Sequence, residues 1–319
     1  MSEASLKNAI TLLVFTRDNI DRIDPLVKTT SWIENRIAVD MRSEDGTAES
    51  LRRAGFEVHT IERQTFVDEL RNQHLSLPKT PWTLILDSDE YLADDAEELI
   101  GKLLSSAGDS VVGFSIPRHN YFLKKKLMGS GWYPDHQLRL FRTDQILYSV
   151  GHHKPPMPKD ESMTIKVCEA PSCIHIHHNN YPTIEEFLRR QLHYAMTDEY
   201  DKDPRSFDFD DYILRAIEQF NLRREETVDG DISYVTGLAM YWDQIIRGLI
   251  HWERTGYEGH LSEHIPNQVF VARAFSNISR DQIDFDRIHK EYTTSLSWRI
   301  TTPLRYFYSV AISFFQLRK

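Results

Sequence analysis

The stretch that decides the fold is WTLILDSDE, residues 82–90. A mostly apolar run leads directly into an acidic turn, which is typical of a buried strand that ends at the edge of a sheet. Other strand-sized apolar runs lie at 10–15, 37–40 and 57–61, and segments with helical periodicity at 25–33, 48–54 and 66–75 separate them. This alternation predicts an α/β fold with a mostly parallel central sheet flanked by helices.

The rest of the chain divides into two regimes. Further strands are expected without intervening helices, so the sheet should gain antiparallel strands, at 111–117, 137–142, 164–168 and 173–178. Beyond residue 180 the periodicity becomes helical, at 184–200, 209–223, 234–253 and 281–293. We therefore expect an α/β domain over residues 1–180 and a helical C-terminal region over residues 181–319.

Composition limits the classes of function. The chain of 319 residues has 38 Lys and Arg against 48 Asp and Glu, a net charge of −10, which argues against a general nucleic-acid binder. Its two cysteines, Cys168 and Cys173, are too few for a disulfide framework and favour the cytoplasm. No apolar stretch approaches the roughly 20 residues of a membrane span, and no signal peptide is evident.

Three carboxylates follow strands of the expected sheet. Asp40 ends one strand, and Asp87 and Asp89 follow another, with two residues of spacing that points both side chains to one side. Ligands of open α/β sheets bind beyond the carboxyl ends of strands, where such carboxylates can contact a nucleoside and hold a divalent cation on a diphosphate. The alternative is a pair of solvated turns that cap the next helices.

These motifs resemble family 2 glycosyltransferases with the GT-A fold, in the branch that makes bacterial lipopolysaccharide, capsule and cell-surface polysaccharide. The likeness is carried by DMRSEDGT at 40–47, RN at 71–72, DSDE at 87–90, GWYPDHQLRLF at 131–141 and SWRITTPLR at 297–305. It covers residues 9 to about 180 in order and touches the tail. DSDE corresponds to the DxD metal motif of that family.

The resemblance implies a nucleotide-diphosphate-sugar donor held with Mg2+ or Mn2+. The donor-binding residues would be Thr16, Arg17, Asp18, Asp40, Arg71, Asp87, Ser88 and Asp89. Asp87 and Asp89 would hold the metal, and His177 could complete its ligands; the alternatives for His177 are a core histidine or an independent zinc site with His175. The first loop departs from the usual Asn-Glu pair, because it reads Arg17-Asp18-Asn19.

Inverting transfer needs a base across the sugar from the metal. Asp135 is the first candidate, with a turn aspartate as its alternative reading. The second is His153, or its neighbour His152, in a segment where many relatives read Val-His-Glu and Lys154 replaces the glutamate. Trp132, Arg139 and His152 are expected to contact the acceptor or phosphate, although Arg139 could also be an ion pair that supports the sheet.

The tail from Leu304 to Leu317 has a broad apolar face beside Arg305, Arg318 and Lys319. It could lie on the inner face of the cell membrane, or pack onto the domain or a partner subunit. The expected function is thus an inverting, metal-dependent glycosyltransferase that acts on a glycan or lipid-linked glycan hydroxyl. The alternatives are an inactive GT-A scaffold protein or a nucleotidyltransferase, but the latter should have a glycine-rich loop after its first strand, which the sequence FTRDN at 15–19 lacks.

Overall fold

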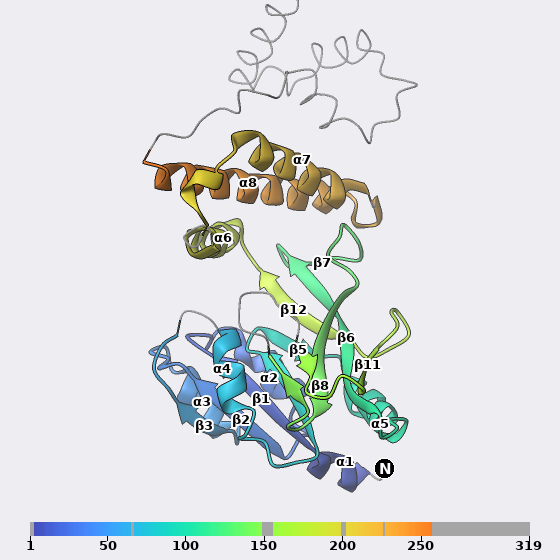
Figure 1. Ribbon diagram of the computed structural model, residues 1–319. Helices are drawn as coiled ribbons and strands as arrows, with labels where there is room; N and C mark the ends of the chain where they lie inside the picture. The colour runs from blue at the N-terminus through green and yellow to red at the C-terminus, as the bar shows by residue number, and fades with distance from the viewer. Residues whose placement is uncertain (1–2, 65–66, 149–155, 199–201, 226, 257–319) are drawn as a thin grey trace, which may run out of the picture. The chain divides into compact units, whose positions relative to one another are not determined.

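The chain is described by a computed structural model, which covers residues 3–64, 67–148, 156–198, 202–225 and 227–256 (Figure 1). All the described residues belong to one compact unit that spans residues 1–261. The boundary expected at residue 180 lies inside this unit and stays a prediction.

The first half of the sheet is parallel throughout. Its strand order is β3-β2-β1-β4, with helices between successive strands (Figure 1). The elements are α1 (Glu3–Ala9), β1 (Ile10–Thr16), α2 (Ile23–Thr29), β2 (Asn35–Asp40), α3 (Thr47–Arg53), β3 (Glu57–Thr60), α4 (Val67–His74) and β4 (Trp82–Asp87). The strands and helices expected between residues 10 and 87 are all present, with small shifts in their bounds.

The second half of the sheet is mixed and continues the order as β4-β8-β6-β12-β5. Strand β8 runs antiparallel to both β4 and β6, whereas β12 runs parallel to β6. The elements are β5 (Glu90–Leu92), α5 (Ala96–Ser105), β6 (Val111–Phe122), β7 (Lys125–Lys126), β8 (Asp135–Arg142), β9 (Ile146–Leu147), β10 (Met157–Pro158), β11 (Thr164–Val167) and β12 (Ile176–Tyr181). The largest differences from expectation are that β6 extends to Phe122 and that β12 runs from Ile176 to Tyr181.

The core lies on both faces of the sheet, because alternate residues of a strand point to opposite sides. Within β1, Leu12 and Val14 pack into one apolar cluster, and Leu13 and Phe15 pack into another. All four side chains are buried, and each contributes about 1.5–3 kcal/mol of transfer free energy. The carboxyl end of β1 is thereby held rigidly between its neighbours.

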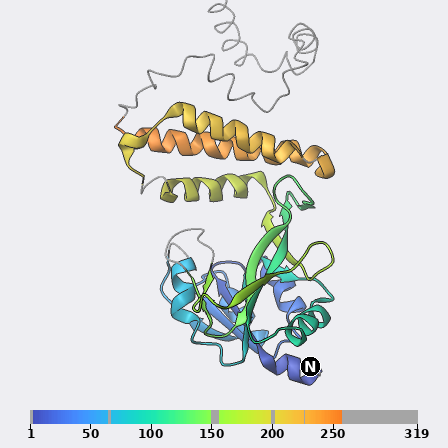
Figure 2. The ribbon, with the colours of Figure 1, turned by 45° about the vertical axis from the view of Figure 1, so that its right-hand side comes forward.

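Three helices follow the sheet: α6 (Ile184–Asp198), α7 (Phe209–Glu225) and α8 (Asp231–Arg254), with short 3-10 turns η1 (Pro204–Ser206) and η2 (Thr227–Asp229) between them. Helices α7 and α8 run side by side (Figures 1 and 2). A Cβ atom at Gly237 of α8 would lie 3.0 Å from the ring of Phe220 in α7, so the glycine permits this close approach. Phe122, Tyr181, Phe187 and Ile232 form a cluster that connects the strands to the helices.

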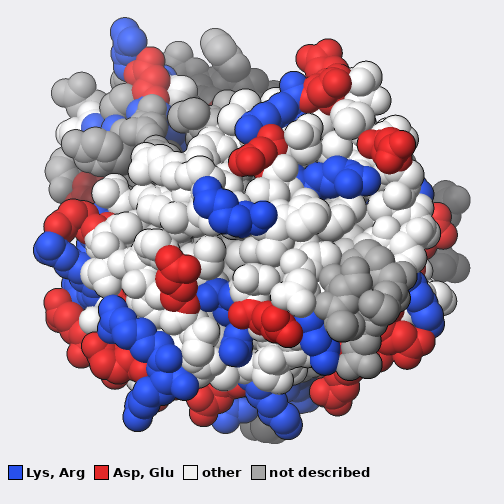
Figure 3. Space-filling view, turned by 90° about the horizontal axis from the view of Figure 1, so that it is seen from below, with Lys and Arg blue, Asp and Glu red and all other residues white. Residues whose placement is uncertain are grey.

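The structure confirms the expected fold class: an α/β fold whose central sheet is flanked by helices and followed by a helical region. On the face seen in Figure 3, Lys and Arg are interspersed with Asp and Glu, so charge there is balanced locally. Among the described helices, none combines the length and the apolar character that crossing a membrane requires. The helix expected at 281–293 and the apolar face at 304–317 lie outside the described residues.

Candidate functional site

The expected donor residues meet at the carboxyl edge of the parallel strands. In the strand register, Thr16 at the end of β1 lies opposite Asp40 at the end of β2. Phe15, one residue earlier, lies opposite Asp87 at the end of β4. Three strands therefore deliver Thr16, Asp40 and Asp87 to one edge, where α/β sheets bind ligands.

The loops after β1 and β2 are tied together by short hydrogen bonds. Ser43 donates its hydroxyl to Asp40 Oδ1 over 2.6 Å, and the Asp18 backbone N–H donates to Ser43 Oγ over 2.9 Å. Asp18 Oδ1 in turn accepts from the Glu44 backbone N–H over 2.8 Å. Asp40 is buried, and its hydrogen bond to Ser43 helps to hold these two loops together. Arg17, in the loop after β1, is exposed.

Asp87 is enclosed by arginines. Its Oδ1 accepts from Arg71 and its Oδ2 from Arg139, at 2.7 Å and 2.5 Å. Burial alone raises the pKa of Asp87, but the charges of Arg139 and Arg71 outweigh it and hold the pKa far below its usual range. Arg139 also donates to Glu90 Oε1 over 2.7 Å, and Glu90 is fully buried. Arg139 is thus part of an ion network at this edge.

Asp89 has a different set of partners. Its Oδ1 lies 3.5 Å from Nε2 of His178 in β12, and its Oδ2 lies 3.2 Å from NH2 of Arg190 in α6. Burial raises the pKa of Asp89, yet His178 and Arg190 together hold it well below its usual range. Glu186, one helical turn before Arg190, also pairs with Arg190 and with Arg22. The helical region thereby contributes directly to the site.

Asn120 of β6 connects the two sides of the site. Its Nδ2 donates to Asp135 Oδ2 over 2.9 Å and to the backbone oxygen of Trp132 over 3.1 Å. Since both of those partners can only accept, Oδ1 must accept the Nδ1–H of His178, at 2.8 Å. With Nδ1–H engaged by Asn120, Nε2 is the ring nitrogen that faces Asp89.

Asp135 opens β8 and is held by three side chains. Oδ2 accepts from Arg118 and Asn120, and Oδ1 accepts from Gln137 over 2.7 Å. Burial raises the pKa of Asp135, but the charge of Arg118 and these hydrogen bonds together lower it by more, so the net shift is downward. The side chain is still 26% exposed, and Oδ1 has room for one more donor. Asp135 is therefore a carboxylate that an acceptor hydroxyl could reach.

The structure places His178, not His177, beside Asp89. His177 is on the opposite face of β12, where its Nδ1 lies 2.9 Å from the Tyr121 hydroxyl and its ring stacks on Tyr91 at 4.9 Å. Burial lowers the pKa of His177 to about 4. His177 is therefore not the histidine that lies beside Asp89, because successive residues of a strand face opposite sides.

Asp89 Oδ1 and His178 Nε2 are the two groups at this edge that could share a divalent cation. A separation of 3.5 Å between a carboxylate oxygen and an imidazole nitrogen is long for a hydrogen bond but suits two ligands of one ion. The Nδ1–H bond to Asn120 is the support that metal-bound histidines generally have. Asp87 differs from expectation, because both its oxygens are occupied by arginines. Within the described residues no group of three or more His, Cys, Asp and Glu is arranged to hold a metal, so phosphate oxygens would have to supply further ligands.

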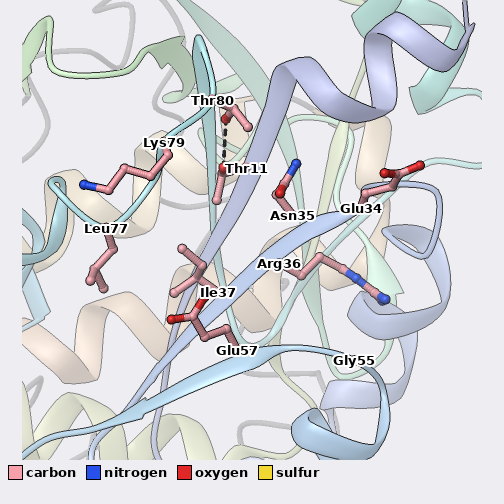
Figure 4. A pocket seen from close by; sticks show the side chains of 10 residues that line it. All are labelled: Thr11, Glu34, Asn35, Arg36, Ile37, Gly55, Glu57, Leu77, Lys79 and Thr80. Atoms are coloured by element: carbon pink, nitrogen blue, oxygen red, sulfur yellow. Dashed lines mark hydrogen bonds between the residues drawn. The ribbon is translucent and has the colours of Figure 1, made fainter.

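A surface hollow of about 250 Å³ lies at the opposite edge of the sheet (Figure 4). It is lined by Thr11 and Asn35 near the starts of β1 and β2, with charged side chains of both signs around it, and Thr11 Oγ1 lies 2.7 Å from Thr80 Oγ1. The hollow is at the amino ends of the strands, whereas the acidic motif is at their carboxyl ends, so it plays no part in the candidate site.

The remaining expected residues have mixed placements. Ser88 is buried next to Asp87, and Trp132 lies in the loop before Asp135. His152 and His153 lie outside the described residues, so their role as base or acceptor contact stays a prediction. The sequence reasoning missed Glu90, Arg118, Asn120, His178, Glu186 and Arg190. A longer β6 would have revealed Arg118 and Asn120, because both lie on the face of β6 that holds Asp135.

No family model matches the chain. Among solved structures it is similar to the crystal structure of S. aureus TarS 1-349, with 12% identity over 77% of this chain and 86% of that chain and a TM-score of 0.38. The same protein in complex with UDP-GlcNAc matches with 13% identity over 77% and 87%, at a TM-score of 0.37. Glucosyl-3-phosphoglycerate synthase from Mycobacterium tuberculosis, in complex with Mn2+, UDP and glucosyl-3-phosphoglycerate, matches with 15% identity over 38% and 49%, at 0.30. At such identities and TM-scores these similarities do not assign a family to the chain.

Proposed function

We propose that this protein is a glycosyltransferase that uses a nucleotide-diphosphate sugar, together with Mn2+ or Mg2+, and transfers the sugar with inversion to a hydroxyl of a glycan or lipid-linked glycan. The observation that carries the proposal is the position of Asn120, which bonds both His178 and Asp135. One residue thereby joins the side that would hold the diphosphate to a carboxylate that would face the acceptor. The donor sugar would lie between them.

On the donor side, positive charge is available for a leaving diphosphate. Arg71, Arg139 and Arg190 converge on Asp87 and Asp89, and each lies within hydrogen-bonding distance of one of these carboxylates. A diphosphate that binds here would exchange some of these carboxylate contacts for phosphate contacts, which arginine makes well. Fixed charges that are in place before the bond breaks stabilise the departing group without reorganisation.

Asp89 and His178 would hold the cation. When bound, the ion would neutralise charge that develops on the diphosphate as the glycosidic bond to it breaks. An imidazole ligand beside a carboxylate suits Mn2+ better than Mg2+, which proteins bind chiefly through oxygen atoms. By accepting the Nδ1–H of His178, Asn120 would keep Nε2 directed at the metal position.

On the acceptor side, Asp135 Oδ1 would take the proton of the attacking hydroxyl. Its depressed pKa keeps it ionised near neutral pH, which a base requires, although it also makes the carboxylate a weaker base. Gln137 and Arg118 orient the carboxylate. Trp132, just before it, offers an aromatic face to a sugar, and His153 remains the second candidate for the base.

The finer assignments also belong to this proposal. They are a place in bacterial cell-surface polysaccharide synthesis, contact of the tail with the inner membrane face or with a second subunit, a cytoplasmic location, and a helical region after residue 180 that contributes to the acceptor side. The competing reading is a scaffold protein that has lost turnover. Intact Asp40, Asp89 and Asp135 argue against it, because a scaffold has no need of charges held at a sheet edge.

The test is a thermal-shift titration with UDP-, GDP-, CMP- and dTDP-sugars, each with Mn2+ and with EDTA. We expect one nucleotide class to stabilise the wild type in Mn2+ only. Asp89→Ala should lose that stabilisation, and Asp109→Ala, an exposed acidic residue elsewhere on the chain, should keep it. No stabilisation of the wild type by any nucleotide would contradict the proposed function and favour a scaffold.

A further inference from the structure

The loop from Met128 to Pro134 leads into Asp135, and the helical region holds it by two charged side chains. One is Asp229 in η2, just before α8, and the other is Arg223 near the end of α7. Neither residue contacts the donor side of the site among the contacts described, and nothing in the proposed chemistry requires them. Their contacts with the loop are nevertheless numerous and short.

Asp229 binds the start of the loop. Its Oδ1 accepts the backbone N–H of Met128 over 2.6 Å, and its Oδ2 accepts the backbone N–H of Gly129 over 3.1 Å and the hydroxyl of Ser130 over 2.8 Å. One carboxylate therefore satisfies three consecutive donors from a segment about 100 residues away in sequence. Charge-assisted bonds of this kind are among the stronger ones in proteins.

Arg223 binds the next stretch. Its NH1 donates to the backbone oxygens of Ser130 and Gly131, at 3.1 Å and 2.6 Å, and its guanidinium lies 4.5 Å from the ring centre of Trp132. Arg223 is buried, and that burial lowers its pKa. Burying a guanidinium against neutral carbonyl oxygens costs free energy, because no opposite charge compensates for the lost hydration. The hydrogen bonds to these carbonyls offset part of that cost.

The loop needs this support because its backbone is strained. Ser130 has φ of 54° and Gly131 has φ of 64°, so two consecutive residues lie in the left-handed region. For a serine this conformation costs about 1–2 kcal/mol. A Cβ atom at Gly131 would lie 2.6 Å from Arg223 NH1, so a larger residue at this position would displace the guanidinium. Strain of this kind persists only where surrounding contacts determine the conformation.

The strained segment connects directly to the acceptor side. Asn120, which holds Asp135, also binds the backbone oxygen of Trp132, the residue that follows Gly131. The indole N–H of Trp132 is buried and has no hydrogen-bond partner among the described residues. A displacement at Ser130 or Gly131 would therefore move Trp132 and Asp135 together.

From these contacts we infer that Asp229 and Arg223 are positioning residues for the acceptor. They hold Trp132 and Asp135 in the orientation that receives the acceptor hydroxyl, whereas the geometry of the donor side does not depend on them. The helical region would thus set the acceptor geometry through this clamp, meaning Asp229 and Arg223. The inference rests on the proposed function, since it assigns an acceptor role to the same site.

Two variants of the full chain test the clamp. Asp229→Asn keeps an oxygen that accepts from Met128, but it places an amide NH2 against the Gly129 N–H and the Ser130 hydroxyl. Arg223→Lys replaces the planar guanidinium with a single ammonium group, which cannot bridge the two carbonyl oxygens in the same geometry. The matched controls are Asp231→Asn and Arg224→Lys, because each lies within two residues of its counterpart and neither contacts the loop in the bonds described.

The first readout is hydrogen exchange, which needs no ligand. We expect both clamp variants to accelerate exchange of the amides at 128–137 by about tenfold or more, with β1 and β4 unchanged and with no change in the controls. Exchange at 132–137 that equals the wild-type rate would overturn the inference. So would equal acceleration by the control variants.

The second readout separates positioning from general damage. With UDP-glucose and Mn2+ as the donor probe and methyl β-D-glucopyranoside as the acceptor probe, we expect the clamp variants to need about tenfold more acceptor for half-maximal transfer. Hydrolysis of the donor by water should stay within about twofold of the wild type. A parallel loss of hydrolysis and transfer would contradict a positioning role. Failure of the proposed function would instead show as no turnover by the wild type, and the exchange readout would still decide the inference.

Discussion

The two faces of the paired strands β6 and β12 both carry histidines, but the surroundings of these histidines differ. Residues 118–120 of β6 lie in register with 176–178 of β12, so side chains alternate between the faces. One face bears Arg118, Asn120 and His178, which are joined to carboxylates. The other bears His119 and His177 among tyrosines. Adjacent histidines therefore have unrelated surroundings, and the difference shows which of them can take part in charge-based chemistry.

The second face is an aromatic stack of neutral groups. The ring of His119 lies 4.5 Å from that of Tyr133 and 4.4 Å from that of His175, and both pairs are nearly parallel. Burial lowers the pKa of His119 to about 3. Tyr133 belongs to the loop that precedes Asp135, and its hydroxyl donates to Nε2 of His175 over 2.8 Å. This neutral face thus anchors the loop before Asp135, while the other face carries the ion pairs and hydrogen bonds around Asp89 and Asp135.

The largest effect is expected at Asp135, where the charged face meets the acceptor. Asp135→Asn preserves the shape and removes the proton acceptor, so transfer should fall by about 10²–10⁴. Nucleotide binding should be unchanged, because the donor contacts are elsewhere. Steady-state transfer and calorimetry on the same sample measure the two quantities. Wild-type transfer by the variant would shift the base assignment to His153.

Glu90→Gln tests whether the charges of this face are mutually dependent. Glu90 is fully buried and accepts from both Arg118 and Arg139 at 2.7 Å. Its neutral replacement therefore removes one negative charge that balances these two buried guanidinium groups. The free energy of unfolding should fall by about 3 kcal/mol. Urea denaturation measures it. Glu98→Gln, on an exposed helix surface, is the control and should leave the midpoint unchanged; equal midpoints for both variants would refute the dependence.

Arg190→Gln tests the contribution of the helical region to the donor side. Arg190 lies 3.2 Å from Asp89 and would turn to a bound phosphate, so its loss should weaken binding of UDP with Mn2+ by about tenfold. The neighbouring Arg189 is exposed, and Arg189→Gln should bind as the wild type does. Calorimetric titration distinguishes them, and equal affinities in the two variants would exclude Arg190 from the donor site.

The smallest effect is expected on the neutral face. Because the pKa of His119 is depressed in the folded state, the unfolded state binds more protons between about pH 3 and 6.5, and stability falls as pH drops through that range. His119→Phe keeps a stacking ring and removes the titration. The melting temperature should then depend less steeply on pH between 4 and 6.5. An unchanged slope would mean that His119 is not held neutral.

The edge of the parallel strands could be predicted from sequence for a simple reason. Residues 82–86 are mostly apolar and the acidic motif follows at once, so the strand and its end are both marked, and Asp40 is marked in the same way. In a parallel sheet the carboxyl ends of β2 and β4 lie at the same edge, on either side of β1. The position of Asp40 and Asp87 at one edge of the sheet was therefore within reach of pattern reasoning.

The partners of these carboxylates were less accessible, because their contacts depend on register and tertiary packing. Alternation places His175 and His177 on one face, but it does not say which face carries the chemistry, and the strand expected at 173–178 begins at Ile176 instead. Arg190 meets Asp89 across 101 residues, and a charged residue on a helix surface has no local signal for such a contact. Glu90 was treated as part of an acidic turn, whereas it is the buried centre of an ion network.

The most direct test of the account compares the adjacent histidines. His178→Gln and His177→Gln are matched changes on opposite faces of β12, and each is titrated calorimetrically with UDP in the presence of Mn2+ or EDTA. We predict that His178→Gln weakens Mn2+-dependent UDP binding by at least about tenfold and that His177→Gln stays within about twofold of the wild type. A loss in His177→Gln with wild-type binding in His178→Gln would contradict the assignment of the two faces.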